Sequence, residues 1–284
     1  MKTNILKAIT NLVNNPVYKL NEFYKSNNRA NNMGDALEEY IKDIFANTIN
    51  EKDINIRNEK ISQTFSYLGN KNNPPDIIIR GGDAIEVKKI ESSNSALALN
   101  SSYPKSKLYA NSIMITKTCR ECENWNEKDI IYTVGVVKDN CLNSVCMVYG
   151  IDYAADLEIY EEIKRVIKDE ILTINDVEFA ETNELGRVNR VDPLGITYLR
   201  VRGMWHIENP MKTFNYIYKS SQSDKFSFMA LINNEKYFGF SVADRIEFEK
   251  MVKENSDISM SEVNIKNPNN PAILKNAYLI TYNN

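Results

Sequence analysis

The sequence predicts an α/β protein. Over residues 33–46, Leu37 and Ile41 belong to a set of apolar residues that recur at the spacing of an amphipathic helix. The runs at 130–137 and 145–149 are short, continuous and apolar, as is typical of buried strands. Segments of both kinds follow one another along the chain, which indicates a mixture of helices and strands.

The other elements are placed by the same patterns. Helices are expected near residues 3–14, 33–46, 113–125, 156–170 and 241–254. Strands are expected near residues 62–68, 76–80, 84–90, 130–137, 145–149, 196–202, 226–233 and 277–282. A division into residues 1–150 and 151–284 fits this order, but no clear linker separates the two regions, so one continuous domain is the alternative.

Bulk composition limits the class of protein. The chain has 284 residues, of which 43% are hydrophobic, enough to build a sizeable core. No stretch approaches the ~20 apolar residues of a membrane span. Residues 1–7 have neither a continuous apolar run nor the small-residue cleavage site of a secretion signal. We therefore expect a soluble cytoplasmic protein that does not bind a membrane.

The cysteines do not indicate a disulfide framework. They lie at positions 119, 122, 141 and 146, too few and too close together for a secreted scaffold. Cys119 and Cys122 have a spacing found in zinc sites, but Cys141 and Cys146 fall in an expected strand region and the single histidine is His206. Buried or incidental thiols are the better interpretation.

The charge distribution permits nucleic-acid binding. The net charge of −3 argues against it at first sight. However, residues 99–120 hold four basic side chains and no carboxylate, and residues 187–202 hold four arginines and one carboxylate. By contrast, residues 152–184 hold eleven acidic and three basic residues. An acidic protein with two basic stretches can bind DNA while its acidic remainder limits unselective adhesion.

The segment 74–89 has the clearest chemical signature. Two short apolar strands flank the Gly-Gly-Asp sequence at 81–83, which is typical of a hairpin turn. Because side chains alternate along a strand, Glu86 and Lys88 share one face. A three-residue loop at 81–83 places Asp76 opposite Lys88 on that face, whereas a two-residue loop turns Asp76 away. We therefore predict an odd-numbered loop or an equivalent bulge.

This arrangement suits phosphodiester hydrolysis. Magnesium prefers carboxylate and backbone oxygens and is usually held by one or two carboxylates plus the substrate phosphate. Asp76, Glu86 and the carbonyl oxygen of Val87 are the candidate ligands, and Lys88 would position the attacking water or offset the phosphate charge. The alternative is an ordinary solvated strand face with an incidental ion pair, because an acid-x-Lys triplet is common by itself.

Glu38 is a candidate supporting carboxylate. At 100° per residue, it borders the apolar face of the helix at 33–46, whereas Glu39 lies nearly opposite. Glu38 could thus assist a metal ion directly or through water. An ordinary surface glutamate on an amphipathic helix explains the position equally well.

Pro75-Asp76 followed by Glu86-Val87-Lys88 resembles the PD-(D/E)XK nuclease motif. Most of the chain also resembles the NgoPII family of type II restriction endonucleases, and these longer matches are far more specific than the catalytic triplet. The matching segments are residues 26–31, 34–40, 65–70, 73–107, 184–193, 200–205 and 265–271.

The resemblance implies a fold and an activity. It implies a restriction-endonuclease-like core, with a mixed central sheet flanked by helices, and C-terminal DNA-recognition elements. Residues 1–150 would form the catalytic core, and residues 151–284 the recognition and dimerisation region. The implied activity is magnesium-dependent cleavage of double-stranded DNA at a short GC-rich palindrome, GGCC, by a homodimer. A cognate DNA methyltransferase would be a functional rather than a physical partner. The catalytic motif carries over as Asp76, Glu86 and Lys88.

Basic and polar residues outside the hairpin are candidates for DNA contacts. Arginine is well suited to the O6 and N7 atoms of guanine, and a two-fold dimer matches a palindromic site. The candidate base readers are Arg187, Arg190, Arg200 and Arg202; the candidate phosphate contacts are Arg29, Asn100, Ser101, Lys105 and Lys107. For any one of the four arginines, the alternative is a salt-bridged surface strand near the acidic segment.

Three other functions remain as alternatives. A nuclease of repair or recombination would share the metal hairpin but select DNA by shape. A catalytically silent protein would bind DNA without cutting it. A small-molecule or structural α/β protein would fail to bind duplex DNA even at low salt.

Overall fold

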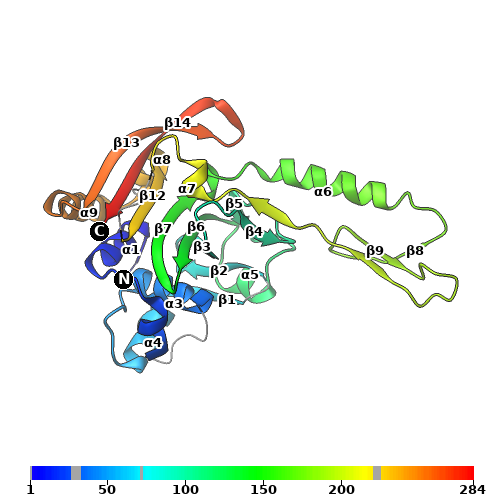
Figure 1. The fold of residues 1–284 in the computed structure, drawn as a ribbon, viewed down its shortest axis with the longest axis horizontal. Coiled ribbons are helices and arrows are strands. Elements are labelled where there is room, and N and C mark those ends of the chain that lie inside the picture. The colour runs from blue at the N-terminus through cyan, green and yellow to red at the C-terminus, as the bar shows by residue number, and fades with distance from the viewer. Residues whose placement is uncertain (1, 27–32, 71–72, 220–224) are drawn as a thin grey trace.

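The computed structural model describes residues 2–26, 33–70, 73–219 and 225–284, and within them one nine-stranded mixed sheet forms the centre of the molecule (Figure 1). In spatial order its strands are β1 (Phe65–Asn70), β2 (Asn73–Ile79), β3 (Ala84–Ile90), β6 (Glu127–Lys138), β7 (Cys141–Tyr149), β12 (Ser227–Asn233), β14 (Asn270–Asn283) and β13 (Ile258–Asn267), with β5 (Lys107–Tyr109) beside β6. The pairs β3–β6 and β7–β12 are parallel and the others antiparallel. Strands from both sides of residue 150 therefore share this sheet.

Helices flank the sheet, as expected for an α/β protein of this class. They are α1 (Ile5–Asn14), α2 (Leu20–Ser26), α3 (Met33–Ala46), α4 (Ile54–Thr64), α5 (Lys117–Glu121), α6 (Leu157–Ile171), α7 (Pro210–Thr213), α8 (Asn234–Gly239) and α9 (Val242–Glu254), with a 3-10 turn η1 (Gly150–Asp152). In the described part of the chain, no helix combines the length and apolar character needed to cross a bilayer.

The two faces of the sheet bury two separate cores. Side chains alternate across a strand, so neighbouring residues of β2 and β3 belong to different cores. Ile77 and Ile85 pack with α1, α3 and α9 on one face. Ile78 and Ala84 pack on the other face, with side chains that follow β3 in the sequence. The odd-numbered residues of β3 therefore face the helices, and the even-numbered ones face the opposite side.

Helix α3 packs against the sheet over a glycine. A Cβ atom built on Gly135 in β6 would come within 2.6 Å of a methyl carbon of Leu37. A larger residue at this position would require the Leu37 side chain to shift. Gly135 therefore leaves room for Leu37 where α3, which carries Glu38, packs beside β3, the parallel neighbour of β6.

An arm projects from the body of the molecule (Figure 1). It consists of α6 and a separate small sheet of β8 (Glu178–Phe179), β9 (Gly186–Asn189) and β10 (Leu199–Val201). Where the arm begins, the ring of Tyr160 stacks on Tyr103 and meets the edge of Trp205. Trp205 lies in β11 (Trp205–Ile207), which pairs with β4 (Leu97–Asn100), the first strand after β3. The base of the arm thus contacts the segment that follows the hairpin.

The sequence patterns located most long elements but misplaced several short ones. The helix expected at 113–125 is wrong over most of its length, since only α5 is helical. Thr116 caps this short helix by accepting the N–H of Cys119, and Asn73 binds the carbonyl of Met114, so the residues before Lys117 are held in a turn. The strand expected at 62–68 overlaps the end of α4, and the strand expected at 196–202 is only β10.

Helix α4 and strand β13 were not predicted at all. In α4 only Arg57 and Ile61 are buried, so the helix has almost no apolar periodicity. In β13 the buried residues are Ile258 and Ile265, and the remaining residues are largely polar and exposed. Both elements are stabilised by contacts with neighbouring segments. A local hydrophobic pattern in the sequence does not reveal such contacts.

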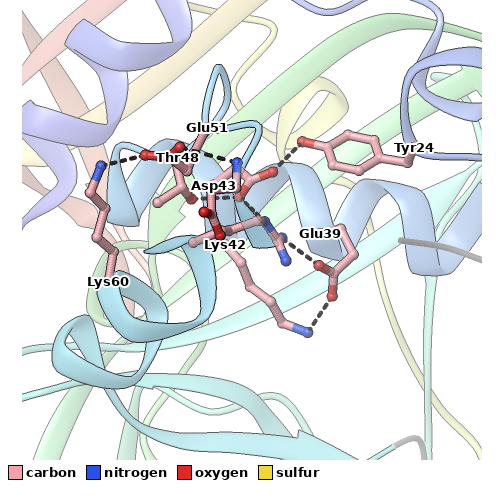
Figure 2. Close-up of polar contacts among 9 residues, drawn as sticks. Tyr24, Glu39, Lys42, Asp43, Thr48, Glu51 and Lys60 are labelled. Atoms are coloured by element: carbon pink, nitrogen blue, oxygen red, sulfur yellow. Dashed lines mark hydrogen bonds and ion pairs between the residues drawn. The ribbon is translucent and has the colours of Figure 1, made fainter. Parts of the chain in front are cut away.

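A buried polar network joins the N-terminal helices (Figure 2). The carboxylate of Asp43 in α3 is fully buried and accepts hydrogen bonds from Tyr24 (2.9 Å), Thr48 (2.5 Å) and the Nε atom of Arg57 (2.8 Å). Arg57 is only 4% exposed and also binds Glu39 through Nη2, at 2.6 Å. These bonds fix α2, the turn after α3 and α4 against α3.

We predict that Asp43→Ala destabilises the protein by about 3–5 kcal/mol, because the Arg57 guanidinium would remain buried without this partner. Urea unfolding at neutral pH measures the change. The matched control is Asp169→Ala, which removes an exposed ion pair with Arg165 on α6 and should leave the midpoint nearly unchanged. Equal effects of the two substitutions would contradict this account of the network.

Candidate active site

The hairpin of β2 and β3 has the odd-numbered loop that the sequence predicted, but its register differs. Ile78 pairs with Ala84, so five residues, 79–83, join the strands. Continuing the register places Asp76 opposite Glu86, not opposite Lys88 as expected from a three-residue loop. The loop is wider because the N–H of Ile79 binds the carbonyl of Asp83, and the N–H of Gly82 binds the carbonyl of Ile79.

Because the loop has an odd number of residues, the three motif residues lie on one face of the sheet. Asp76, Glu86 and Lys88 have even positions in their strands, whereas Val87 points to the opposite core. The Nζ atom of Lys88 lies 2.6 Å from Oε1 of Glu86. Oδ2 of Asp76 accepts the backbone N–H of Val87 at 2.7 Å. The two carboxylates and the ammonium therefore converge where β2 and β3 separate.

Burial and like charge shape the electrostatics of this group. Burial, together with the negative charge of Glu86, raises the pKa of Asp76 to about 7. Burial alone would lower the pKa of Lys88, but the charges of Glu86 and Asp76 outweigh it, and the pKa of Lys88 is raised. Lys88 thus stays protonated beside the carboxylates, and Asp76 holds its proton more tightly than an exposed aspartate.

Glu38 lies within electrostatic range of the same group. Its charge contributes to raising the pKa values of both Asp76 and Lys88. Its Oε1 atom is 2.8 Å from Nζ of Lys42, one helical turn later in α3. Lys42 also binds Glu39, so the ion pairs of Figure 2 extend toward Glu38. The structure therefore places the predicted supporting carboxylate near the motif, held by a lysine.

The arrangement fits a hard divalent cation. Glu86 is 8% exposed, and its Oε2 atom has no hydrogen-bond partner among the described residues. A buried carboxylate oxygen without a partner is costly unless an ion or solvent satisfies it. The described residues contain no cluster of three or more acidic, histidine or cysteine side chains in metal-binding geometry. Two carboxylates and one backbone carbonyl, that of Val87, form the candidate donor set, which suits magnesium better than zinc.

The segment after β4 divides into exposed and buried residues. Asn100 and Ser101 are exposed, and Nζ of Lys107 pairs with Glu127 at 2.5 Å. Lys105 is buried instead, and its charge interacts with those of Glu86 and Lys88. The structure thus places Lys105 beside the motif.

The four candidate arginines lie on the arm. Arg187 in β9 is opposite Arg200 in β10, and both are exposed. Arg200 makes a two-point contact with Glu184 (2.7 and 2.9 Å), which also pairs with Arg202 at 2.5 Å. Nε of Arg190 is 3.4 Å from Glu178. Three of the four therefore have carboxylate partners on the arm. Arg29 lies outside the described residues.

Comparison with known proteins identifies the family. The model of the NgoPII restriction endonuclease family matches residues 3–266. The chain belongs to this family. It is also 56% identical over 280 residues to the type II restriction enzyme NgoPII of Neisseria gonorrhoeae, an alignment that covers 98% of this chain and 99% of that protein. No solved structure matches the chain.

The chain is thus a restriction endonuclease, and sequence reasoning missed several residues of its candidate site. Lys42 was not singled out, although its spacing of four residues from Glu38 was a usable signal. Tyr132 was also missed; it is the β6 neighbour of Glu86, and its hydroxyl accepts the backbone N–H of Lys105 at 2.7 Å. No local pattern reveals these neighbours, because the first depends on the parallel pairing of β3 with β6 and the second joins residues far apart in the sequence.

We predict that Asp76→Asn stabilises the metal-free protein at pH 8 but not at pH 4. The folded-state pKa of Asp76, about 7, lies above its ordinary value of 3.8. The folded protein therefore binds this proton more tightly than the unfolded chain, and stability falls as pH rises from about 4 to about 7. Asparagine cannot ionise, yet it can still accept the Val87 N–H.

Urea unfolding in a chelating buffer at both pH values measures the difference. Because one pKa unit corresponds to about 1.4 kcal/mol, the gain at pH 8 is at most about 4 kcal/mol. A stability difference that does not change between pH 4 and pH 8 would contradict this description of Asp76.

Proposed function

We propose that this restriction endonuclease hydrolyses both strands of DNA at a short GC-rich palindrome, GGCC by family resemblance, with magnesium and as a homodimer. The observation that carries the proposal is the convergence of Asp76, Glu86 and Lys88 on one face of the sheet, with an unpartnered buried oxygen on Glu86 among the described residues. Such a group is poorly suited to a structural role, since buried charges are costly unless paired or bound to metal.

The side chains have separate tasks in this proposal. Asp76, Glu86 and the Val87 carbonyl would hold a magnesium ion, which would supply Lewis acidity toward the phosphate and activate water as the nucleophile. Lys88 has three N–H donors, so it can keep its contact with Glu86 while it donates to a phosphate oxygen or orients the attacking water. Glu38, held by Lys42, assists from α3 directly or through water.

DNA recognition is assigned to the arm and to the segment after β4. Asn100, Ser101 and Lys107 are proposed to contact phosphates and set the register, and Arg29, which lies outside the described residues, is proposed to do the same. The arginines of the arm, Arg187, Arg190, Arg200 and Arg202, contact guanine edges or phosphates in this proposal. Three of them, Arg190, Arg200 and Arg202, would give up carboxylate partners, at a small cost because ion pairs near the surface are weak.

The cellular setting follows from the activity. A palindromic site is read by two copies of the chain, each contacting one half. Cytoplasmic DNA would also need protection from cleavage, so a cognate DNA methyltransferase is the functional partner. Digestion of a mapped plasmid and sequencing of the ends tests the assignment. Fragments ending at GGCC sites support it, whereas cleavage selected by DNA shape would indicate a repair or recombination nuclease.

We predict that Asp76→Ala and Lys88→Ala each abolish plasmid cleavage with Mg²⁺ while the protein remains folded and still binds duplex DNA. The reason is that each removes a group acting on the scissile phosphate. The matched control is Lys89→Ala, which removes the adjacent exposed lysine that pairs with Glu91 and should cleave normally. Cleavage by either active-site variant at the wild-type rate, or loss of folding together with binding, would refute these catalytic roles.

We predict that Arg200→Ala or Arg202→Ala weakens binding to a GGCC duplex about tenfold if that arginine reads a guanine, with little change on a scrambled duplex. An arginine that contacts a phosphate loses affinity on both duplexes, and its salt dependence becomes shallower. Gel-shift titrations at several salt concentrations separate these outcomes. Arg165→Ala on α6, which removes an exposed pair with Asp169, is the control. Unchanged affinity on both duplexes would exclude that arginine from the interface.

A further inference from the structure

Lys105 is a buried cation that the catalytic motif does not explain. It is 8% exposed, and its Nζ atom donates hydrogen bonds to Oγ of Ser102 and, at 3.2 Å, to the carbonyl of Tyr103. Both partners are uncharged. Lys105 and Glu86 line one small cavity of about 10 Å³, about the space of one water molecule. The lysine therefore lies beside the metal-binding carboxylate, on a segment outside the motif.

The backbone around Lys105 is tightly held. Its N–H donates to the hydroxyl of Tyr132, the β6 neighbour of Glu86. A Cβ atom on Gly150 would come within 2.3 Å of the Lys105 carbonyl oxygen, so the segment passes directly against η1. The hydroxyl of Tyr103 donates to Glu161 on the arm at 2.6 Å. These contacts hold the segment that carries Lys105 in place. A flexible lysine that binds phosphate would not need such contacts.

A buried ammonium is costly unless negative charge offsets it. Burial lowers the pKa of Lys105 to about 8, whereas the charge of Glu86 acts to raise it and that of Lys88 to lower it further. Removing the lysine would relieve this cost but would leave the carboxylates Asp76 and Glu86 with one positive charge fewer. The negative charge of Glu86 thus attracts the positive charge of Lys105.

We propose that Lys105 is a built-in counter-cation for Glu86, which weakens divalent-metal binding to the free enzyme and makes tight metal binding depend on the DNA phosphate. The inference rests on the proposed function, since it concerns the same metal site. A fixed positive charge repels an incoming divalent ion. The scissile phosphate adds negative charge and a further oxygen ligand, which overcome that repulsion. Lys105 acts as a positioning residue through Glu86 and need not touch the substrate.

The test is the affinity of the metal alone for the DNA-free enzyme. Lys105→Met keeps most of the side-chain volume and removes the charge, whereas Lys105→Arg keeps the charge. Isothermal titration with Mn²⁺ should show that Lys105→Met binds at least tenfold more tightly than wild type, and that Lys105→Arg binds within about threefold of it. A merely structural lysine gives the opposite result, because disturbing the site weakens metal binding. Unchanged or weaker binding by Lys105→Met would overturn the inference.

A second measurement needs no substitution at Lys105. In the wild-type enzyme, Ca²⁺ should bind at least tenfold more tightly in the presence of a cognate duplex than without DNA. Because coupling between two ligands is reciprocal, the duplex should bind more tightly by the same factor when Ca²⁺ is present. Equal Ca²⁺ affinities with and without DNA would overturn the inference even if Lys105→Met fails to fold.

Glu86→Gln separates failure of this inference from failure of the proposed function. Loss of metal binding in Glu86→Gln, together with unchanged affinity in Lys105→Met, would overturn only the counter-cation role. Unchanged metal binding in Glu86→Gln would remove the metal site itself, and both proposals with it.

Discussion

The candidate site depends on one electrostatic constraint, the placement of several carboxylates close together on a partly buried face of the central sheet. Asp76 and Glu86 raise each other's energy when both are ionised, and burial makes the effect larger. Two lysines partly offset this repulsion. Lys88 contacts Glu86, and Lys42 contacts Glu38. The site is therefore a group of carboxylates whose mutual repulsion is partly offset by neighbouring lysines.

The scaffold around this group is rigid at the points where position matters. Gly135 leaves room for the Leu37 side chain of α3, and Gly150 lets the segment of Lys105 pass against η1. The parallel pairing of β3 and β6 places Tyr132 next to Glu86. Asp83 at the hairpin loop is anchored by Lys236, from the C-terminal part of the chain, at 2.6 Å. The central sheet therefore uses both halves of the sequence to hold one hairpin.

The projecting arm contrasts with that rigid centre. Helix α6 has no buried residue, and its apolar side chains Ile159, Ile163 and Val166 are exposed. The arginines of β9 and β10 are also exposed, and those with carboxylate partners can exchange them easily. The proposed function thus assigns recognition to exposed side chains and catalysis to a buried group in a different part of the chain. The contact of Tyr103 with Glu161 joins the two.

The sequence by itself determined the α/β class, most of the long elements and the shared face of Asp76, Glu86 and Lys88. It could do so because helical spacing and strand alternation are local properties of the chain. Tertiary structure alone decided the register that places Asp76 opposite Glu86, and it buried Lys105 beside the motif. The hydrogen bonds within the five-residue turn and the pairing of β3 with β6 set these positions. Contacts between residues far apart in the sequence leave no periodic signal in it.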